Sequence, residues 1–170
     1  MAVRHRLVKA SPQTVWNVLA DGDRYSEWVV GTSSTQEMTG EWPRVDAEIA
    51  YEIRVGPLKL TNETVVRRCR KPDVLELEAR AGVLGTARIA FELRPWGRYC
   101  LVILDEHPLQ GVGGLLHNAG VEVVTQLRHR ALLGRLAKVC ESDARGERPD
   151  DDARKTPAAA RSHAVGGADA

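Results

Sequence analysis

The chain has 170 residues, which suits one domain of ordinary size and is short for two. Apolar residues make up 43% and charged residues 28%, both near the averages of globular proteins, so the composition argues against collagen-like, fully disordered and membrane classes. Lys and Arg number 24 against 23 Asp and Glu, and this balance argues against a nucleic-acid partner. The chain has no run of about 18 apolar residues, so we expect no membrane span.

The cysteines and the first residues bear on the compartment. Cys69, Cys100 and Cys140 are odd in number and share no CxxC spacing, so neither a disulfide framework nor a zinc site is predicted. The first residues alternate charged and apolar side chains, where a secretory signal needs an unbroken apolar segment. We therefore expect a cytoplasmic protein.

The first elements are predicted from local signals. Alternation of apolar and charged side chains over residues 3–7 predicts a strand with one buried face. Ser11 is a preferred helix N-cap and Pro12 suits the first helical position, so a helix is expected over residues 12–20. A second short helix or turn follows and ends at Gly31.

Beyond Gly31 the sequence consists of strand-length segments divided by Gly and Pro turns, and it predicts six strands. Apolar and charged side chains alternate in most of them, as over residues 75–80, which indicates antiparallel strands with one apolar face. Residues 100–104 form an unbroken apolar run instead. This run predicts a central strand that is covered on both faces.

Apolar residues recur at intervals of three to five from Leu115 to Cys140, which predicts a long amphipathic helix. In this register Leu127 faces the sheet and Arg128 faces the solvent. A sheet with one apolar face needs a cover, and this helix is the only predicted element large enough to supply it.

The composition changes near the C-terminus. From Ser142 to Ala170 only Val165 is a large apolar residue, and such a segment buries too little surface to offset the entropy of ordering it. We therefore expect a folded domain over residues 1–141 and a disordered tail over residues 142–170.

Catalytic and cofactor motifs are absent from the sequence. It contains no G-x-S-x-G and no H-E-x-x-H, and no two of its five histidines are spaced i, i+4. The glycines of 111–114 lie between a strand and a helix, as phosphate loops do, but the G-x-G-x-x-G pattern fails at Leu116, so a hinge is predicted. We expect no metal and no cofactor.

Four polar residues share the inward strand faces with apolar residues: Tyr51, Asn62, Thr64 and Glu106. Burying an unpaired polar group costs about 1 to 3 kcal/mol, so such residues need partners, water or a ligand. Either each reaches water at a strand end, or together they line a cavity. In a cavity, desolvation is expected to raise the pKa of Glu106. Trp28 either fills the core or lies at the cavity mouth.

Two segments carry a family resemblance. SPQTVWNVL at Ser11–Leu19 and DRYSEW at Asp23–Trp28 resemble the opening of the bacterial polyketide cyclase/dehydrase and lipid-transport group of the START-like superfamily, also called SRPBCC or Bet v 1-like. The similarity extends over residues 1 to about 141 and includes Glu106-His107-Pro108 and His117-Asn118. It implies an α+β helix-grip fold, in which a curved antiparallel sheet of about seven strands wraps around a long C-terminal helix, with two short helices after the first strand. The chain lacks an iron-binding His/Asp set, which disfavours the oxygenase branch.

The resemblance implies an apolar cavity, and our first hypothesis is binding or transport of a small hydrophobic ligand, such as a lipid or polyketide, by a monomer or weak homodimer. The alternative is a polyketide aromatase/cyclase that acts by general acid-base catalysis, with Glu106, His117 and Tyr51 as candidates. A third is a protein-interaction module, for which the sequence shows no exposed apolar patch. The predicted ligand-binding residues are Trp28, Tyr51, Ile53, Asn62, Thr64, Leu77, Ile89, Phe91, Glu106, His117, Asn118 and Val124.

Overall fold

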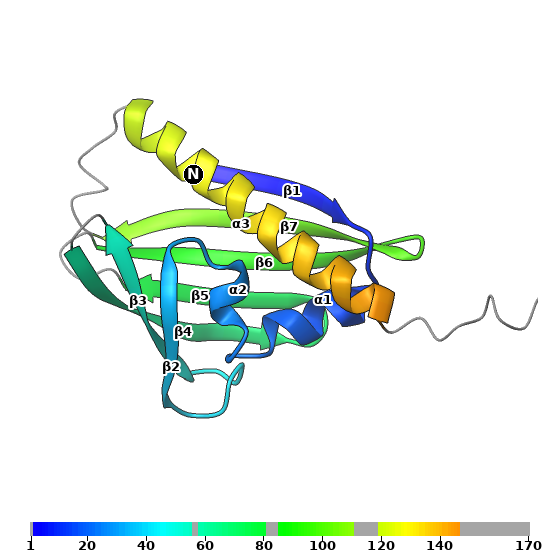
Figure 1. The fold of residues 1–170 in the computed structure, drawn as a ribbon, viewed down its shortest axis with the longest axis horizontal. Helices are drawn as coiled ribbons and strands as arrows, with labels where there is room; N and C mark the ends of the chain where they lie inside the picture. The colour runs from blue at the N-terminus through cyan, green and yellow to red at the C-terminus, as the bar shows by residue number, and fades with distance from the viewer. Residues whose placement is uncertain (1, 56–57, 81–84, 111–118, 147–170) are drawn as a thin grey trace, which may run out of the picture.

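A computed structural model describes residues 2–55, 58–80, 85–110 and 119–146. Seven antiparallel strands form one curved sheet in the order β1-β7-β6-β5-β4-β3-β2, and three helices lie on one side of it (Figure 1). The helices are α1 (Pro12–Leu19), α2 (Tyr25–Trp28) and α3 (Ala119–Gly146). The strands are β1 (Ala2–Val8), β2 (Thr32–Thr39), β3 (Glu48–Val55), β4 (Leu58–Arg70), β5 (Val74–Arg80), β6 (Thr86–Trp96) and β7 (Tyr99–Gln110). The predicted α+β helix-grip fold is confirmed.

Helix α1 begins where the local signals predict. The backbone N–H of Thr14 donates a hydrogen bond to the Ser11 hydroxyl oxygen at 3.0 Å, and Pro12 occupies the first turn. The helix buries Val15, Trp16 and neighbouring apolar residues against the core. Its N-terminus is therefore fixed by sequence-local chemistry and its position by packing.

Strand alternation divides the sheet into an inner face toward the helices and an outer face. On β6 the inner residues Ile89, Phe91 and Leu93 are buried, while Arg88 and Glu92 on the outer face are partly exposed. Each inner residue is paired with inner residues of the neighbouring strands, such as Leu104 of β7 opposite Phe91. The inner face therefore provides the core.

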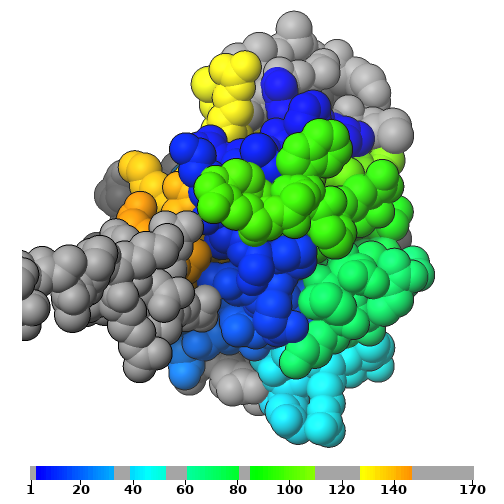
Figure 2. Space-filling model, turned by 90° about the vertical axis from the view of Figure 1, so that its right-hand side faces the viewer, coloured from blue at the N-terminus to red at the C-terminus, as the bar shows by residue number. Residues whose placement is uncertain are grey.

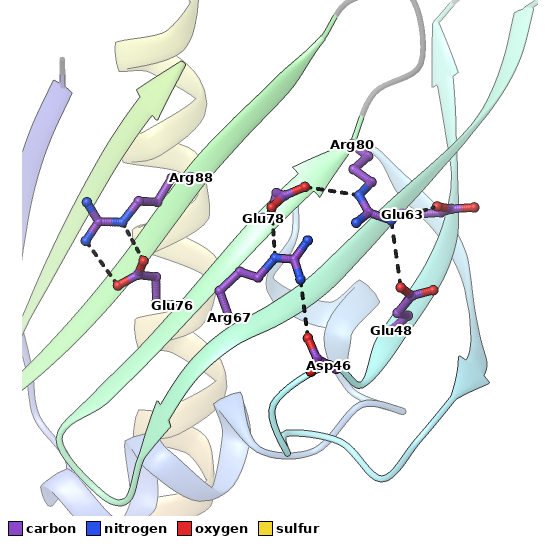
Figure 3. Close-up of polar contacts among 8 residues, drawn as sticks. All are labelled: Asp46, Glu48, Glu63, Arg67, Glu76, Glu78, Arg80 and Arg88. Atoms are coloured by element: carbon purple, nitrogen blue, oxygen red, sulfur yellow. Dashed lines mark hydrogen bonds and ion pairs between the residues drawn. The ribbon is translucent and has the colours of Figure 1, made fainter. Parts of the chain in front are cut away.

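The outer face carries a ladder of ion pairs (Figure 3). The Arg67 guanidinium lies 2.8 Å from Glu78 and 3.3 Å from Asp46, and Arg80 lies 3.1 Å from Glu78. Exposed pairs of this kind contribute about 0 to 1 kcal/mol each, so the ladder adds little to stability. It does make the outer face a solvated surface of mutually neutralised charges.

The apolar run of β7 does not lie at the sheet centre. Strand β7 lies between the edge strand β1 and β6, and Leu101 and Ile103 are only partly buried on the outer face. There they are paired with Leu7 and His5 of β1. The prediction that both faces of this run are covered was wrong, because an apolar side chain near a sheet edge is partly shielded by its cross-strand neighbours without a covering layer.

The register of α3 also differs from the prediction. Leu127 is 57% exposed, whereas Leu136 is fully buried. Nine positions separate these residues, or about two and a half turns, which places them on opposite sides of the helix. The face toward the sheet is formed by His129, Leu132, Leu133, Leu136, Ala137 and Cys140. The expected stripe had included Leu127 and omitted His129, because hydrophobicity alone selected its members.

The last turns of α3 pack against the start of the chain. The Arg24 guanidinium lies 2.6 Å from Asp143, and the backbone N–H of Lys9 donates a hydrogen bond to Glu141 at 3.1 Å. Ala144 packs against the core. The helix thus continues past residue 141, where we expected the tail to begin, and residues 147–170 lie outside the described structure.

Asp143→Asn should lower the free energy of unfolding by about 1 kcal/mol, because it removes the charge from a partly shielded pair in which two guanidinium nitrogens contact the carboxylate. Urea denaturation of the full chain measures this. Glu41→Gln is the control, because its pair with Arg44 is well exposed, and it should change stability by less than about 0.5 kcal/mol. Equal changes in the free energy of unfolding for the two variants would show that the end of α3 does not pack against the start of the chain.

Candidate functional site

One part of the inner face is filled by aromatic side chains. Trp28 is 1% exposed and meets Phe91 edge-on, with ring centroids 5.6 Å apart, and Tyr25 at 4.9 Å. Figure 2 shows α1 (blue) between the C-terminal end of α3 (orange) and the strands (green). The burial and ring contacts of Trp28 match the core-filling role, and its predicted contact with a ligand stays a prediction.

Another part of the inner face carries smaller side chains. Thr64, Ala79 and Ala87 are paired in one row across β4, β5 and β6, and the two alanines are only partly buried although they point inward. The nearby row with Leu75 opposite Phe91 is fully buried. The inner face therefore changes from a region of large, buried side chains to a region of small, incompletely covered side chains.

Buried hydroxyl groups border this row. The Tyr25 hydroxyl and the Thr64 hydroxyl share a hydrogen bond of 3.0 Å, and the Tyr51 ring lies 5.3 Å from the Tyr25 ring. Burial raises the pKa of Tyr25 well above its ordinary value, so its hydroxyl stays neutral. Asn62, which is paired with Tyr51 across β3 and β4, is buried as well. This group offers neutral hydrogen-bonding side chains in an apolar setting.

Glu106, Arg128 and His129 form a second polar group, called here the Glu106 cluster. Glu106 points inward from β7, as the alternation predicts, and its side chain is 13% exposed. The His129 Nε2 atom lies 2.6 Å from the Glu106 Oε2 atom, and one Arg128 nitrogen donates to both carboxylate oxygens at 2.6 and 2.8 Å. Arg128 was expected to face only solvent, and this contact corrects that expectation.

The pKa of Glu106 shifts in the direction opposite to our expectation. Burial, the largest single influence, raises the pKa of this carboxyl. The hydrogen bond from His129 and the positive charge of Arg128 oppose it and together hold the pKa below its ordinary value. Glu106 is therefore a carboxylate at neutral pH, and the prediction of a raised pKa was wrong because it left out these partners.

Sequence reasoning missed His129. Its side chain is fully buried, and among the described residues no partner lies within hydrogen-bond distance of its Nδ1 atom. A neutral imidazole that donates from Nε2 to a carboxylate presents Nδ1 as an acceptor. The available signal was spacing, because His129 precedes the buried Leu132, Leu136 and Cys140 at helical intervals. Within the described ranges, no three His, Cys, Asp or Glu side chains are grouped as a metal site would need.

The structure brings several of the predicted site residues to one surface. Tyr51, Asn62, Thr64, Leu77, Ile89 and Glu106 share the inner face, and Ile89 lies between Glu106 and Leu77 in one row. Phe91 and Trp28 belong to the aromatic core. The side chains of Ile53 and Val124, and residues His117 and Asn118, lie outside the described part of the structure.

Solved structures share this architecture. A protein from Nitrosomonas europaea aligns with a TM-score of 0.67 at 14% identity, covering 84% of this chain and 94% of its own. The protein Ara h 8.0201 aligns with a TM-score of 0.68 at 8% identity, covering 83% and 97%. A protein from Thermus thermophilus aligns with a TM-score of 0.64 at 14% identity, covering 84% and 98%. These likenesses show that the chain shares the helix-grip fold of these solved structures.

The family is defined by sequence. The model for the polyketide cyclase/dehydrase and lipid transport family matches residues 2–141, and the chain belongs to this family. No curated protein matches the sequence. Across the described residues, no helix has the length and apolar character that crossing a membrane requires. Family and fold together support a ligand-binding role in general.

Proposed function

We propose that the protein binds a small, largely apolar ligand, such as a lipid or polyketide, between the inner face of the sheet and α3. The observation that carries this proposal is the incomplete cover over Ala79 and Ala87, next to buried polar side chains. Binding sites of this kind combine a mainly apolar lining with a few polar groups that fix orientation.

The two kinds of lining would recognise different parts of the ligand. Ala79, Ala87 and Ile89 offer apolar surface, and burying apolar area is worth about 25 cal/mol per Å². A ligand hydroxyl or carbonyl would form hydrogen bonds with the Tyr51–Asn62 pair or with the Glu106 cluster. The ligand class is therefore an apolar molecule with at least one neutral oxygen group.

Acid-base catalysis is the second candidate function, and the arrangement of Glu106 and His129 favours it. A carboxylate that holds one imidazole nitrogen orients the other as a general base. His129 would take a proton from a carbon next to a ketone, the resulting enolate would attack a second carbonyl carbon, and the imidazolium would return the proton to the new alkoxide oxygen. Turnover of a poly-ketone substrate that Glu106→Gln abolishes without loss of binding would establish this function.

We also propose that the protein is located in the cytoplasm. Cys69, Cys100 and Cys140 are free thiols. Burial raises the pKa of the Cys140 thiol to about 12 and that of Cys100 to about 11, so both resist conversion to reactive thiolates. Unpaired thiols support a reducing, cytoplasmic setting.

Ala87→Phe should weaken ligand binding by about tenfold or more, because the added ring occupies the space over the inner face. The probe is N-phenyl-1-naphthylamine, a neutral apolar fluorophore whose emission rises on binding. Ala90→Phe is the matched control, because Ala90 lies on the same strand but on the outer face, opposite Glu76 and Asp105. It should leave probe binding unchanged.

A second variant separates a loss of probe binding from a loss of stability in Ala87→Phe. Inserting a larger side chain typically costs about 1 to 3 kcal/mol, so Ala79→Val, a smaller change in the same row, provides a second variant. Probe binding by Ala87→Phe at the affinity of the unchanged protein would overturn the proposed location. Native mass spectrometry of the protein from its own host would then identify any ligand that copurifies with it.

A further inference from the structure

A groove lies between β1 and α3, outside the proposed ligand site. It has a volume of about 280 Å³ and is lined by Arg4, His5, Arg6, Arg130 and Leu133. Figure 1 shows α3 passing diagonally beside β1 on this side of the sheet. Three of the five lining residues are arginines, in a chain with a net charge of only +1.

The guanidinium of Arg6 lies close to Gly134 of α3. A Cβ atom added at Gly134 would lie 3.9 Å from the Arg6 Nη1 atom, so the guanidinium of Arg6 reaches across from β1 to α3. Arg130 is four residues before Gly134 and therefore lies on the same side of the helix. The strand and the helix thus bring two guanidinium groups to one groove.

Neither of these charges is neutralised by the residues that the structure describes. Among the described residues, no carboxylate lies within ion-pair distance of Arg6 or Arg130. By contrast, Arg67, Arg80 and Arg88 on the outer face each have carboxylate partners (Figure 3). Like charges that share a groove repel each other, and a bound anion would remove this repulsion.

We propose that this groove, called here the β1–α3 groove, binds a phosphate monoester. A phosphate monoester carries about −1.5 to −2 charges at pH 7 and three acceptor oxygens, which suits two guanidinium groups better than a single carboxylate does. Arginine is the side chain that best matches phosphate geometry, through paired N–H donors. Leu133 provides an apolar contact for the carbon of the ester. This proposal does not depend on the ligand proposed for the inner face.

The first experiment is a titration of the ¹⁵N-labelled full chain with phenyl phosphate at low ionic strength, followed by NMR. We expect shift changes confined to residues 4–6 and 130–134. Arg6→Gln and Arg130→Gln should each weaken binding by about tenfold, as the loss of a charge-assisted hydrogen bond implies. Arg68→Gln is the control, because Arg68 is exposed on β4, and it should leave the affinity unchanged.

Shift changes spread over the whole surface, or equal weakening by Arg68→Gln, would overturn the proposal, because both indicate only general attraction to positive charge. All three arginines are exposed, so these variants should fold normally, and thermal melting confirms this before the titration.

A second arm distinguishes two sources of the phosphate group. Vesicles of phosphatidylcholine with phosphatidic acid are compared with vesicles of phosphatidylcholine alone, using the full chain and the Arg6→Gln/Arg130→Gln double variant. Binding that needs both phosphatidic acid and the arginines assigns the groove to a lipid headgroup. Binding of phenyl phosphate without vesicle binding assigns it to a soluble phosphate ester. Absence of binding in both arms would refute the site.

Discussion

Leu136→Asp should unfold the domain, whereas the same change at Leu127 should leave it folded. Leu136 is fully buried in the face of α3 that packs on the core, and a carboxylate there has neither water nor a partner charge. The expected loss exceeds about 4 kcal/mol, a large part of the 5 to 15 kcal/mol typical of domain stability. Leu127 is largely exposed, so its substitution should cost less than about 0.5 kcal/mol.

Thermal melting and far-ultraviolet circular dichroism of the two variants measure this difference directly. The pair is matched, because both changes introduce the same charge into the same helix. If Leu127→Asp also lost its cooperative melting transition, α3 would have to be rotated by about half a turn from the described register.

The fold was predictable wherever a local rule sufficed. The Ser11 cap with Pro12 and the period-two alternation of β5 and β6 each depend on neighbours in sequence, and the structure reproduces them. The register of α3 and the position of β7 depend on which elements lie alongside. An unbroken apolar segment such as residues 100–104 is compatible with a strand at the centre of a sheet and with a strand beside the edge strand. Its sequence therefore does not distinguish the two positions.

In the candidate site, too, the features that depend on sequence neighbours were predictable, and those that depend on contacts between distant elements were not. Alternation placed Tyr51, Asn62, Thr64 and Glu106 on the inner face, and they lie there. It gave no information on the partner of Glu106, because His129 is 23 positions further along the chain and on a different element. The direction of a pKa shift depends on such partners as much as on burial, so the sequence alone led to the wrong sign for Glu106.

The pKa of Glu106 makes the stability of the protein depend on pH. Because the folded pKa is lower than the unfolded value of about 4.3, the contact adds stability above pH 4.3, and this contribution is lost as the pH falls through the folded pKa. Glu106→Gln should therefore cost about 1 to 3 kcal/mol at pH 7, because it removes the charged acceptor from Arg128 and His129. The cost should shrink steadily as the pH is lowered below about 4.3.

Urea denaturation of the unchanged protein and of Glu106→Gln across this pH range tests the prediction, and NMR titration of the Glu106 carboxyl measures its pKa directly. Glu92→Gln is the control, because Glu92 pairs with Arg94 on the outer face, where solvent screens the charge, and it should cost less than about 0.5 kcal/mol at any pH. A Glu106 pKa above 4.3 would contradict the prediction, because burial would then outweigh the contacts with Arg128 and His129. In that case the cost of Glu106→Gln should grow toward low pH, where the protonated carboxyl is the more stable form in the folded state.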